Sequence, residues 1–207
     1  MVKSTSRNAK ISLDLEHTRI PCGPTKTAGA RLTLVTLVGF MGAGKTTVGR
    51  ELAKRLAWRF DDLDDLIQAA EGNTIEQIFQ DRGEKAFREI ERRILSATLA
   101  NNTSPRVLAL GGGAFVAAEN QTLLQSERVP VVFLDAPAEE LFARSGQLEI
   151  VRPLRRDRDQ FCALYEQRRP AYLRAAICIQ TSGKEIGSVA EEIIASLNLV
   201  PNSGACE

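Results

Sequence analysis

The chain has 207 residues, 43% hydrophobic and 26% charged, which excludes a wholly disordered or collagen-like protein. Lys and Arg number 27 against 26 Asp and Glu, so the net charge of +1 gives no indication of a nucleic-acid partner. No apolar run reaches about 18 residues and the first thirty residues lack an apolar core, so we expect neither a membrane span nor secretion. Four cysteines without a Cys-x-x-Cys pair, and a single histidine, argue against a zinc site and predict a reduced, cytoplasmic protein.

Residues 1–30 differ from the rest of the chain. Five basic residues against Asp14 and Glu16 give them a local net charge of +3, and they show little apolar periodicity. We interpret them as a loose N-terminal tail, too short for a DNA-binding domain. A transit peptide is the alternative, but the two acidic residues argue against it.

From Leu32 onward, predicted strands alternate with predicted helices, which is typical of a parallel sheet covered on both faces. A Gly at position 72 should end one helix, and Asn73 or Thr74 should cap the next with Glu76 or Gln77 as capping-box partner. The long helix that follows should bury Phe87, Ile90, Ile94 and Ala97, and the last helix should bury Ile186, Val189, Ala190, Ile193, Ile194 and Leu197. Strands are expected at 32–38, just before 60, and at 107–110, 131–134 and 176–181, and helices at 45–57, 64–71, 84–99 and 186–197.

The strongest motif is a complete G-x-x-x-x-G-K-T at residues 39–46, between a predicted buried strand and a predicted helix. Its backbone N–H groups and the helix N-terminus should bind phosphate oxygens, Lys45 should neutralise β- and γ-phosphate charge, and the Thr46 hydroxyl should ligate magnesium. The motif predicts nucleoside triphosphate binding. The chain has no Asn-Lys-x-Asp motif, which argues against a GTPase. Asp135 ends a run similar to a Walker B strand, but we favour a structural role for it as a helix cap.

Acidic residues follow the predicted second strand at 61–65. A solvated acidic turn is one interpretation. The other is a pair of kinase carboxylates, one for magnesium and one for the acceptor hydroxyl, since Asp62 and Asp64 would point the same way from an extended strand end. Asp61 and Asp65 are then expected to be exposed members of the cluster.

Four further features suggest a site that binds an acidic substrate. Arg88 and Glu91 share a helix face, either as a surface ion pair or as part of a site. Gly111-Gly112-Gly113 follows a buried strand, where a backbone can approach a ligand closely. The basic stretch at 152–158, with net charge +3, is either a solvated charge run or a mobile cover over the phosphates, and the paired arginines at 168–169 suit a planar carboxylate.

Taken in order, these motifs resemble the shikimate kinase family over residues 32–198. The match to the family's pattern includes the phosphate loop, which continues to Arg50, and five later segments. These are Asp62-x-Asp64, the 75–91 stretch with Ile75, Phe79, Gly83, Phe87, Arg88 and Glu91, the three glycines, Val151-Arg152-Pro-Leu154 and Arg168…Pro170…Tyr172. The resemblance implies a three-layer α/β P-loop fold similar to nucleoside-monophosphate kinases, with five parallel strands, helices on both faces and a mobile lid. The domain would span 31–200, with the lid at about 146–158 and a C-terminal tail at 201–207.

The resemblance also implies an activity and a set of roles. The expected reaction is transfer of the ATP γ-phosphate to the 3-hydroxyl of shikimate, in the chorismate pathway to aromatic amino acids. Asp64 would bind the acceptor hydroxyls and assist deprotonation, and Lys45 and Arg152 would act on the phosphates. Arg88, Arg168 and the glycines at 111, 112 and 113 would bind shikimate. Magnesium would lie at Thr46 and Asp62, and ATP at Gly42, Ala43, Gly44, Lys45, Thr46, Thr47, Arg144 and Arg152.

Two alternatives remain at this point. One is a sensor or regulatory protein that keeps the kinase-like fold, although Lys45, Asp64, Arg88 and Arg152 are all present. The other is a kinase for a different small hydroxy acid such as gluconate. In each case we expect small-molecule ligands, no nucleic-acid or membrane partner, and a monomer.

Overall fold

The computed structural model describes residues 32–146 and 157–202, so the expected N-terminal tail and most of the expected lid lie outside the described residues. The strands are β1 (Leu34–Val38), β2 (Arg59–Asp62), β3 (Arg106–Ala109), β4 (Val131–Asp135) and β5 (Ile177–Gln180). The helices are α1 (Lys45–Leu56), α2 (Leu63–Glu71), α3 (Ile75–Ala100), α4 (Ala118–Ser126), α5 (Ala138–Ser145), α6 (Arg158–Tyr172) and α7 (Ile186–Leu197), with a short 3₁₀ helix η1 (Ala114–Val116). In this part of the chain no helix has the length and apolar character that a membrane span requires.

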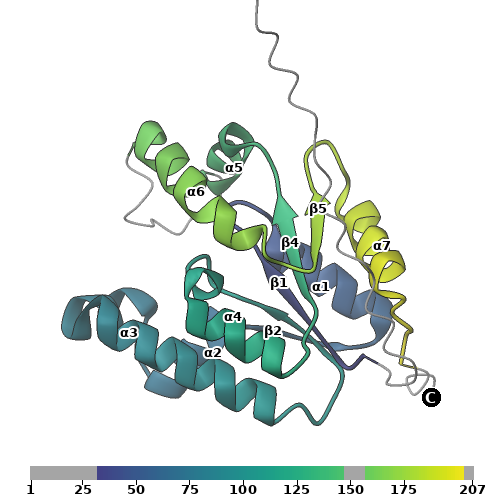
Figure 1. Ribbon diagram of the computed structural model, residues 1–207, viewed down its shortest axis with the longest axis horizontal. Coiled ribbons are helices and arrows are strands. Elements are labelled where there is room, and N and C mark those ends of the chain that lie inside the picture. Colours follow the sequence, from purple (N-terminus) through teal and green to yellow (C-terminus); the bar gives the residue numbers. More distant parts are fainter. Residues whose placement is uncertain (1–31, 147–156, 203–207) are drawn as a thin grey trace, which may run out of the picture.

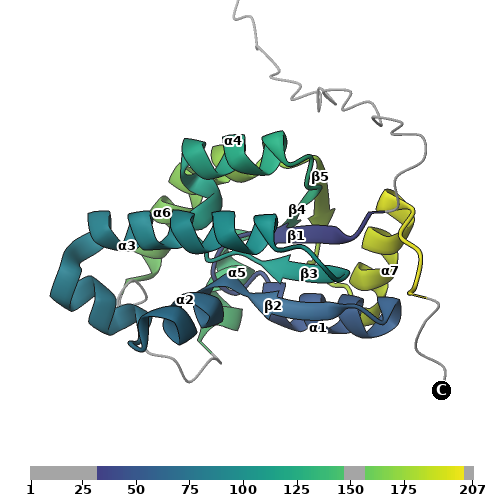
Figure 2. The same ribbon diagram turned by 90° about the horizontal axis from the view of Figure 1, so that it is seen from below.

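All five strands are parallel, in the order β2-β3-β1-β4-β5, which confirms the predicted sheet. Every residue of β1, β3 and β4 is buried, because central strands covered on both faces have no solvent-facing side. Helices α1 and α7 pack together on one face, and α3, α4 and α6 lie over the other (Figures 1 and 2). The carboxyl ends of the strands therefore meet at one edge, where open α/β sheets bind ligands.

The predicted helix ends between α2 and α3 are confirmed. Gly72 caps α2 in the left-handed conformation, and the Thr74 hydroxyl accepts from the Gln77 N–H at 3.2 Å while the Gln77 side chain accepts from the Thr74 N–H at 2.9 Å. Helix α3 begins at Ile75, directly after this cap, and continues past a break at Gly83 through the helix predicted at 84–99.

Several predictions about burial and position were wrong. Ala97 is exposed, and Glu91, Leu95 and Leu99 are buried with Phe87 and Ile90, because the buried face of α3 follows the i, i+4 series from Phe87 and not the predicted alternation of three and four residues. Ile186 is exposed at the first position of α7, one turn before the buried Val189. Asp61 and Asp62 lie within β2 rather than after it, and Asp61 is buried. Asp135 does not cap α5, because that helix begins at Ala138 after Pro137.

Candidate active site

The phosphate loop lies between β1 and α1, as predicted. The Lys45 ammonium folds back over the loop and donates to the carbonyl oxygens of Gly39 (2.9 Å) and Phe40 (3.1 Å). The N-cap of α1 is Gly44, which offers no side-chain hydrogen bond to the helix. The positive end of the α1 dipole and the Lys45 charge therefore lie together at one point, as anion binding requires.

Thr46 and Asp62 form the second part of the site. The Thr46 hydroxyl donates to Asp62 Oδ2 at 3.0 Å, which joins the start of α1 to the end of β2. Asp62 Oδ1 accepts from the Asp64 N–H at 3.1 Å and so caps α2. A hydroxyl and a carboxylate side by side are hard oxygen donors, and this fits the magnesium expected here.

The described residues hold no cluster of three or more His, Cys, Asp or Glu that could bind a metal. A magnesium ion that is bound mainly by nucleotide phosphates and water takes only one or two protein oxygens. The residues present fit the ion as a partner of bound nucleotide.

Asp64 lies in the first turn of α2 and not at an extended strand end, so the predicted geometry for the Asp62–Asp64 pair was wrong. Its neighbour across the site is the backbone after β3. A Cβ atom placed on Gly111 would lie 2.5 Å from Asp64 Oδ1. Only glycine allows this carboxylate and the 111–113 backbone to approach so closely.

Arg88 and Glu91 are not a simple surface pair. Arg88 Nη1 donates to both carboxylate oxygens of Glu91, at 3.1 and 2.9 Å, and the Glu91 side chain is only 1% exposed. Burial raises the pKa of Glu91, while the Arg88 charge acts in the opposite direction. A Cβ atom on Gly113 would lie 2.6 Å from Arg88 Nη2, so this guanidinium also lies against the glycine backbone.

Arg168 reaches the same backbone from α6. Its Nη1 donates to the Gly112 carbonyl at 3.4 Å, and its guanidinium lies 5.9 Å from the centre of the Phe40 ring. The buried Tyr172 hydroxyl donates to the same carbonyl. Burial raises the pKa of Tyr172 to about 12, opposed by the charges of Arg168 and Arg88. The structure therefore brings Arg88 and Arg168, which are far apart in the sequence, to one loop.

Arg144 lies in the last turn of α5 and is held at the end of β5. Its Nη1 donates to Thr181 Oγ1 at 3.0 Å and its Nη2 to the Thr181 carbonyl at 3.1 Å, with Glu140 as a further partner. Arg152 lies outside the described residues. Arg158, at the end of the basic stretch, begins α6 and pairs with Glu139 at 2.6 Å.

Asp135 is structural, as we favoured, but in a way that the sequence did not predict. It is 2% exposed, and its carboxylate accepts from the Tyr165 hydroxyl, from Arg169 Nη2 at 3.0 Å and from Gln180 Nε2 at 3.1 Å. Both oxygens are engaged by protein donors, which argues against a Walker B role. A charged residue that ends a buried strand does signal that compensating partners are present, although it does not say which ones they are.

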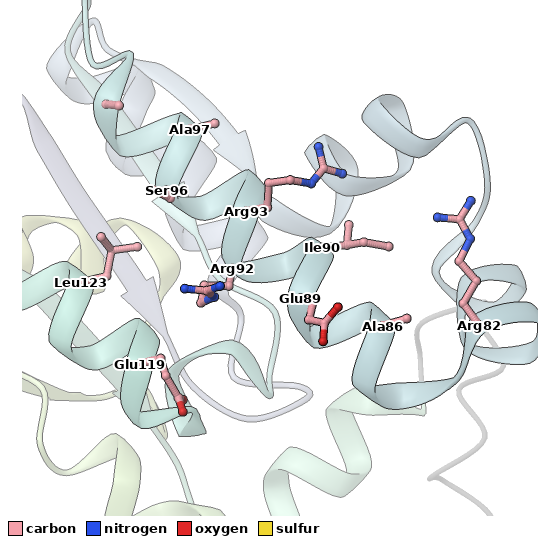
Figure 3. A pocket seen from close by; sticks show the side chains of 11 residues that line it. Arg82, Ala86, Glu89, Ile90, Arg92, Arg93, Ser96, Ala97, Glu119 and Leu123 are labelled. Atoms are coloured by element: carbon pink, nitrogen blue, oxygen red, sulfur yellow. The ribbon is translucent and has the colours of Figure 1, made fainter.

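The candidate acceptor residues meet at the 111–113 loop. A separate groove lies between α3 and α4 (Figure 3), and no residue of the candidate site lines it. That groove has a volume of about 940 Å³. Two of the arginines that line it, Arg82 and Arg93, pair with Glu71 at 2.7 and 2.5 Å. It is therefore separate from the phosphate loop and the three glycines.

Comparison with known proteins gives a consistent result. A sequence model of the shikimate kinase family matches residues 41–198. The chain is 45% identical over 167 residues to a shikimate kinase of Frankia casuarinae (79% of this chain, 72% of the relative) and 39% identical over 162 residues to one of Persephonella marina (77% and 96%). A shikimate kinase from Acinetobacter baumannii in complex with shikimate matches with a TM-score of 0.74 at 36% identity, covering 81% of this chain and 93% of that one.

Proposed function

The chain belongs to the shikimate kinase family, and from this premise we propose how its residues transfer the γ-phosphoryl group of ATP to the 3-hydroxyl of shikimate. The observation that carries the proposal is the meeting of Arg88 and Arg168 at the 111–113 loop, where Asp64 also lies. Two guanidinium groups and a carboxylate there suit a small acid that carries hydroxyl groups.

On the nucleotide side, the N-terminus of α1 and Lys45 bind the phosphates. We assign ATP contacts to the loop residues Gly42, Ala43, Gly44, Lys45, Thr46 and Thr47. Thr46 and Asp62 would hold magnesium, which when bound supplies positive charge against the β- and γ-phosphates. The Lys45 ammonium has to leave the carbonyls of Gly39 and Phe40 and turn to the phosphates when nucleotide binds.

On the acceptor side, Arg88 and Arg168 bind the substrate carboxylate, and Glu91 holds Arg88 in place through its two oxygens. The glycine loop lets the substrate ring lie against the backbone, with Gly111, Gly112 and Gly113 as contacts. Asp64 accepts a hydrogen bond from the 3-hydroxyl. As the O–P bond forms and the bond to ADP breaks, the hydroxyl proton passes to the Asp64 carboxylate.

Two arginines complete the nucleotide site in this proposal. Arg144 is held near the end of β5 through Thr181 and would lie against the adenine. We assign Arg152 to the phosphates as a cover that stabilises the transferred charge.

We also propose that the protein acts as a cytoplasmic monomer. Asp64, Arg88 and Arg168 of a single copy meet at the 111–113 loop, so the proposed acceptor site needs no second copy. The described cysteines, Cys162 and Cys178, are free thiols, which suits a reducing compartment. A sensor would not need Lys45, Asp64 and Arg88 arranged together around a phosphate loop, and the ordered motifs favour shikimate over gluconate.

A coupled assay of ADP release with shikimate, quinate and gluconate tests the substrate, and Asp64→Asn tests the mechanism. We expect turnover with shikimate, and a fall in kcat of about 10²–10⁴-fold in Asp64→Asn, the usual range for a general base. The matched control is Asp65→Asn, an exposed carboxylate one residue away, which should leave kcat unchanged. Equal losses in the two variants would mean that the acidic cluster acts only through its charge.

A further inference from the structure

Asp135 is a buried carboxylate at the sheet edge, and the mechanism above gives it no role. It ends β4, beside the phosphate-loop strand β1, and it is 2% exposed. A buried charge of this kind is strongly unfavourable unless it is paired and hydrogen-bonded. Its partners therefore indicate which elements it holds together.

Two of those partners come from one face of α6. Tyr165 and Arg169 are four residues apart, so their side chains lie one above the other on the helix. The Tyr165 hydroxyl and Arg169 Nη2 both donate to the Asp135 carboxylate, and Arg169 Nε donates to the Tyr165 hydroxyl at 3.1 Å. These hydrogen bonds join the three side chains pairwise, and we call this set of three the Asp135 clamp. It fixes the C-terminal half of α6 to the end of β4.

The last turn of α6 depends on such tertiary contacts. Pro170 lies inside it and has no N–H to donate to the carbonyl of Glu166, so the turn lacks one of its own hydrogen bonds. The same turn carries Arg168. Successive residues of a helix are rotated by about 100° around its axis. With Arg169 held in the clamp, Arg168 therefore points to a different side of α6. That side is the Gly112 carbonyl and the Phe40 ring.

We propose that Asp135, acting through Arg169 and Tyr165, is a positioning residue for shikimate binding, because the clamp sets the rotation of α6 that aims Arg168 at the substrate carboxylate. This inference rests on the proposed function, which assigns that carboxylate to Arg168. The proposed function assigns none of the three clamp side chains to substrate or nucleotide. Its effect is on the acceptor side, where a two-point contact between guanidinium and carboxylate tolerates little misalignment.

The test compares Arg169→Gln with Arg55→Gln. The two arginines match closely: their side chains are 37% and 34% exposed, and each joins a partner four residues earlier on its own helix to a carboxylate on another element. Arg55 connects α1 to Glu191 of α7, away from the 111–113 loop. Shikimate affinity is measured by calorimetry, KM for shikimate and for ATP by steady-state kinetics, and the midpoint of thermal unfolding for each variant.

We expect Arg169→Gln to weaken shikimate binding and raise its KM by about tenfold, as for the loss of an aligned charged hydrogen bond, with KM for ATP within about twofold of the wild type. Arg169→Lys keeps a charge opposite Asp135 and should recover part of the affinity. Tyr165→Phe leaves the ion pair between Arg169 and Asp135 in place, so it should raise KM for shikimate by less than Arg169→Gln does. Arg55→Gln should leave both KM values unchanged, even where its unfolding midpoint falls.

Three outcomes would overturn the proposal. One is an unfolding midpoint that falls in Arg169→Gln with no change in shikimate affinity, which would make the clamp a stabilising contact only. Another is an equal loss of affinity for ATP and for shikimate in Arg169→Gln. The third is a change in shikimate affinity in Arg55→Gln as large as in Arg169→Gln. The proposed function is tested separately, because it fails if the wild type does not bind and phosphorylate shikimate. The clamp proposal fails if the wild type does both and either the variants match it or one of the three outcomes above is found.

Discussion

At the scale of single residues, Asp61 and Asp62 show how a strand separates two adjacent carboxylates. Their side chains point to opposite faces of the sheet because the side-chain period of a strand is two. Asp62 meets Thr46 at the phosphate loop, whereas Asp61 meets Arg59 at 2.7 Å and Arg106 at 3.3 Å. Asp62 therefore lies at the candidate site, whereas Asp61 belongs to a structural ion-pair network.

We predict that Asp61→Asn lowers stability and leaves kcat unchanged. The side chains of Asp61 and Arg106 are 5% and 9% exposed, so the substitution leaves a buried guanidinium without its carboxylate. Removing one partner of a buried pair costs about 3–5 kcal/mol, and the exposed Arg59 makes the lower end more suitable here. Urea unfolding measures the loss, with Asp65→Asn as the exposed control. An unfolding free energy equal to that of the wild type would show that the pair contributes nothing.

Glu91 gives a prediction about pH. Burial raises the pKa of its carboxyl in the folded protein above the ordinary value of 4.5, although Arg88 acts against this. In the window from 4.5 up to the raised pKa, the folded state binds more protons than the unfolded state, so stability falls as pH rises. The side chain that Glu91→Gln introduces does not titrate, so the stability of this variant lacks that pH dependence. The excess stability of the wild type over this variant should therefore be larger near pH 4.5 than at neutral pH.

Urea unfolding of both proteins at the two pH values, without substrate, measures this difference. An excess that grows toward neutral pH would mean that the Arg88 pair outweighs burial and holds the carboxylate ionised. That result would strengthen the role of Glu91 as a charged support for Arg88 while contradicting the direction of the pKa shift.

At the scale of elements, we expect the break in α3 to help place Arg88 against the glycine loop. Gly83 has φ 77° and ψ 173°, a conformation almost limited to glycine, whereas Gly72 has φ 67° and ψ 12° in the left-handed helical region. A Cβ atom at either position would have no heavy atom within 4 Å. Substitution at these two glycines therefore reports backbone strain without steric clash.

Gly83→Ala is expected to destabilise the protein by up to about 3 kcal/mol, and Gly72→Ala by only about 1–2 kcal/mol. Strain at Gly83 should also shift the second half of α3, so KM for shikimate should rise in that variant alone. Thermal unfolding and steady-state kinetics of the two variants check both expectations. Equal loss of stability in both, with equal KM values, would show that the break is not what positions Arg88.

The elements that could be predicted from the sequence depend on neighbours in the chain. The phosphate loop, the Thr74–Gln77 capping box and the buried strands were predicted because each pattern is complete within a few residues. Two ion pairs of buried carboxylates were not predicted, because their members lie far apart in the sequence. Asp61 and Arg106 are 45 residues apart, and Asp135 and Arg169 are 34 residues apart. The direction of Asp64 also needed the structure, because it depends on α2 beginning at Leu63, directly after β2.

At the scale of the whole molecule, every described candidate residue lies between the phosphate loop and β5, on elements of a single sheet and its helices. The family match also begins only at residue 41. The central strand β1 starts at Leu34, and it is fully buried between β3 and β4. Residues 1–30 thus precede the first described strand, and none of them is a candidate site residue.

We predict that a chain lacking residues 1–30 keeps kcat and both KM values within about twofold of the full chain, because it retains every described strand and every candidate site residue. Removal of residues 1–38 is the contrasting case. It deletes β1, whose five residues are all buried and pair with both β3 and β4, so this chain should not fold. Circular dichroism and the shikimate assay on the two truncated chains measure the outcomes. A chain that begins at residue 31, unfolds at the wild-type temperature and has lost most of its turnover would instead give the first thirty residues a part in catalysis.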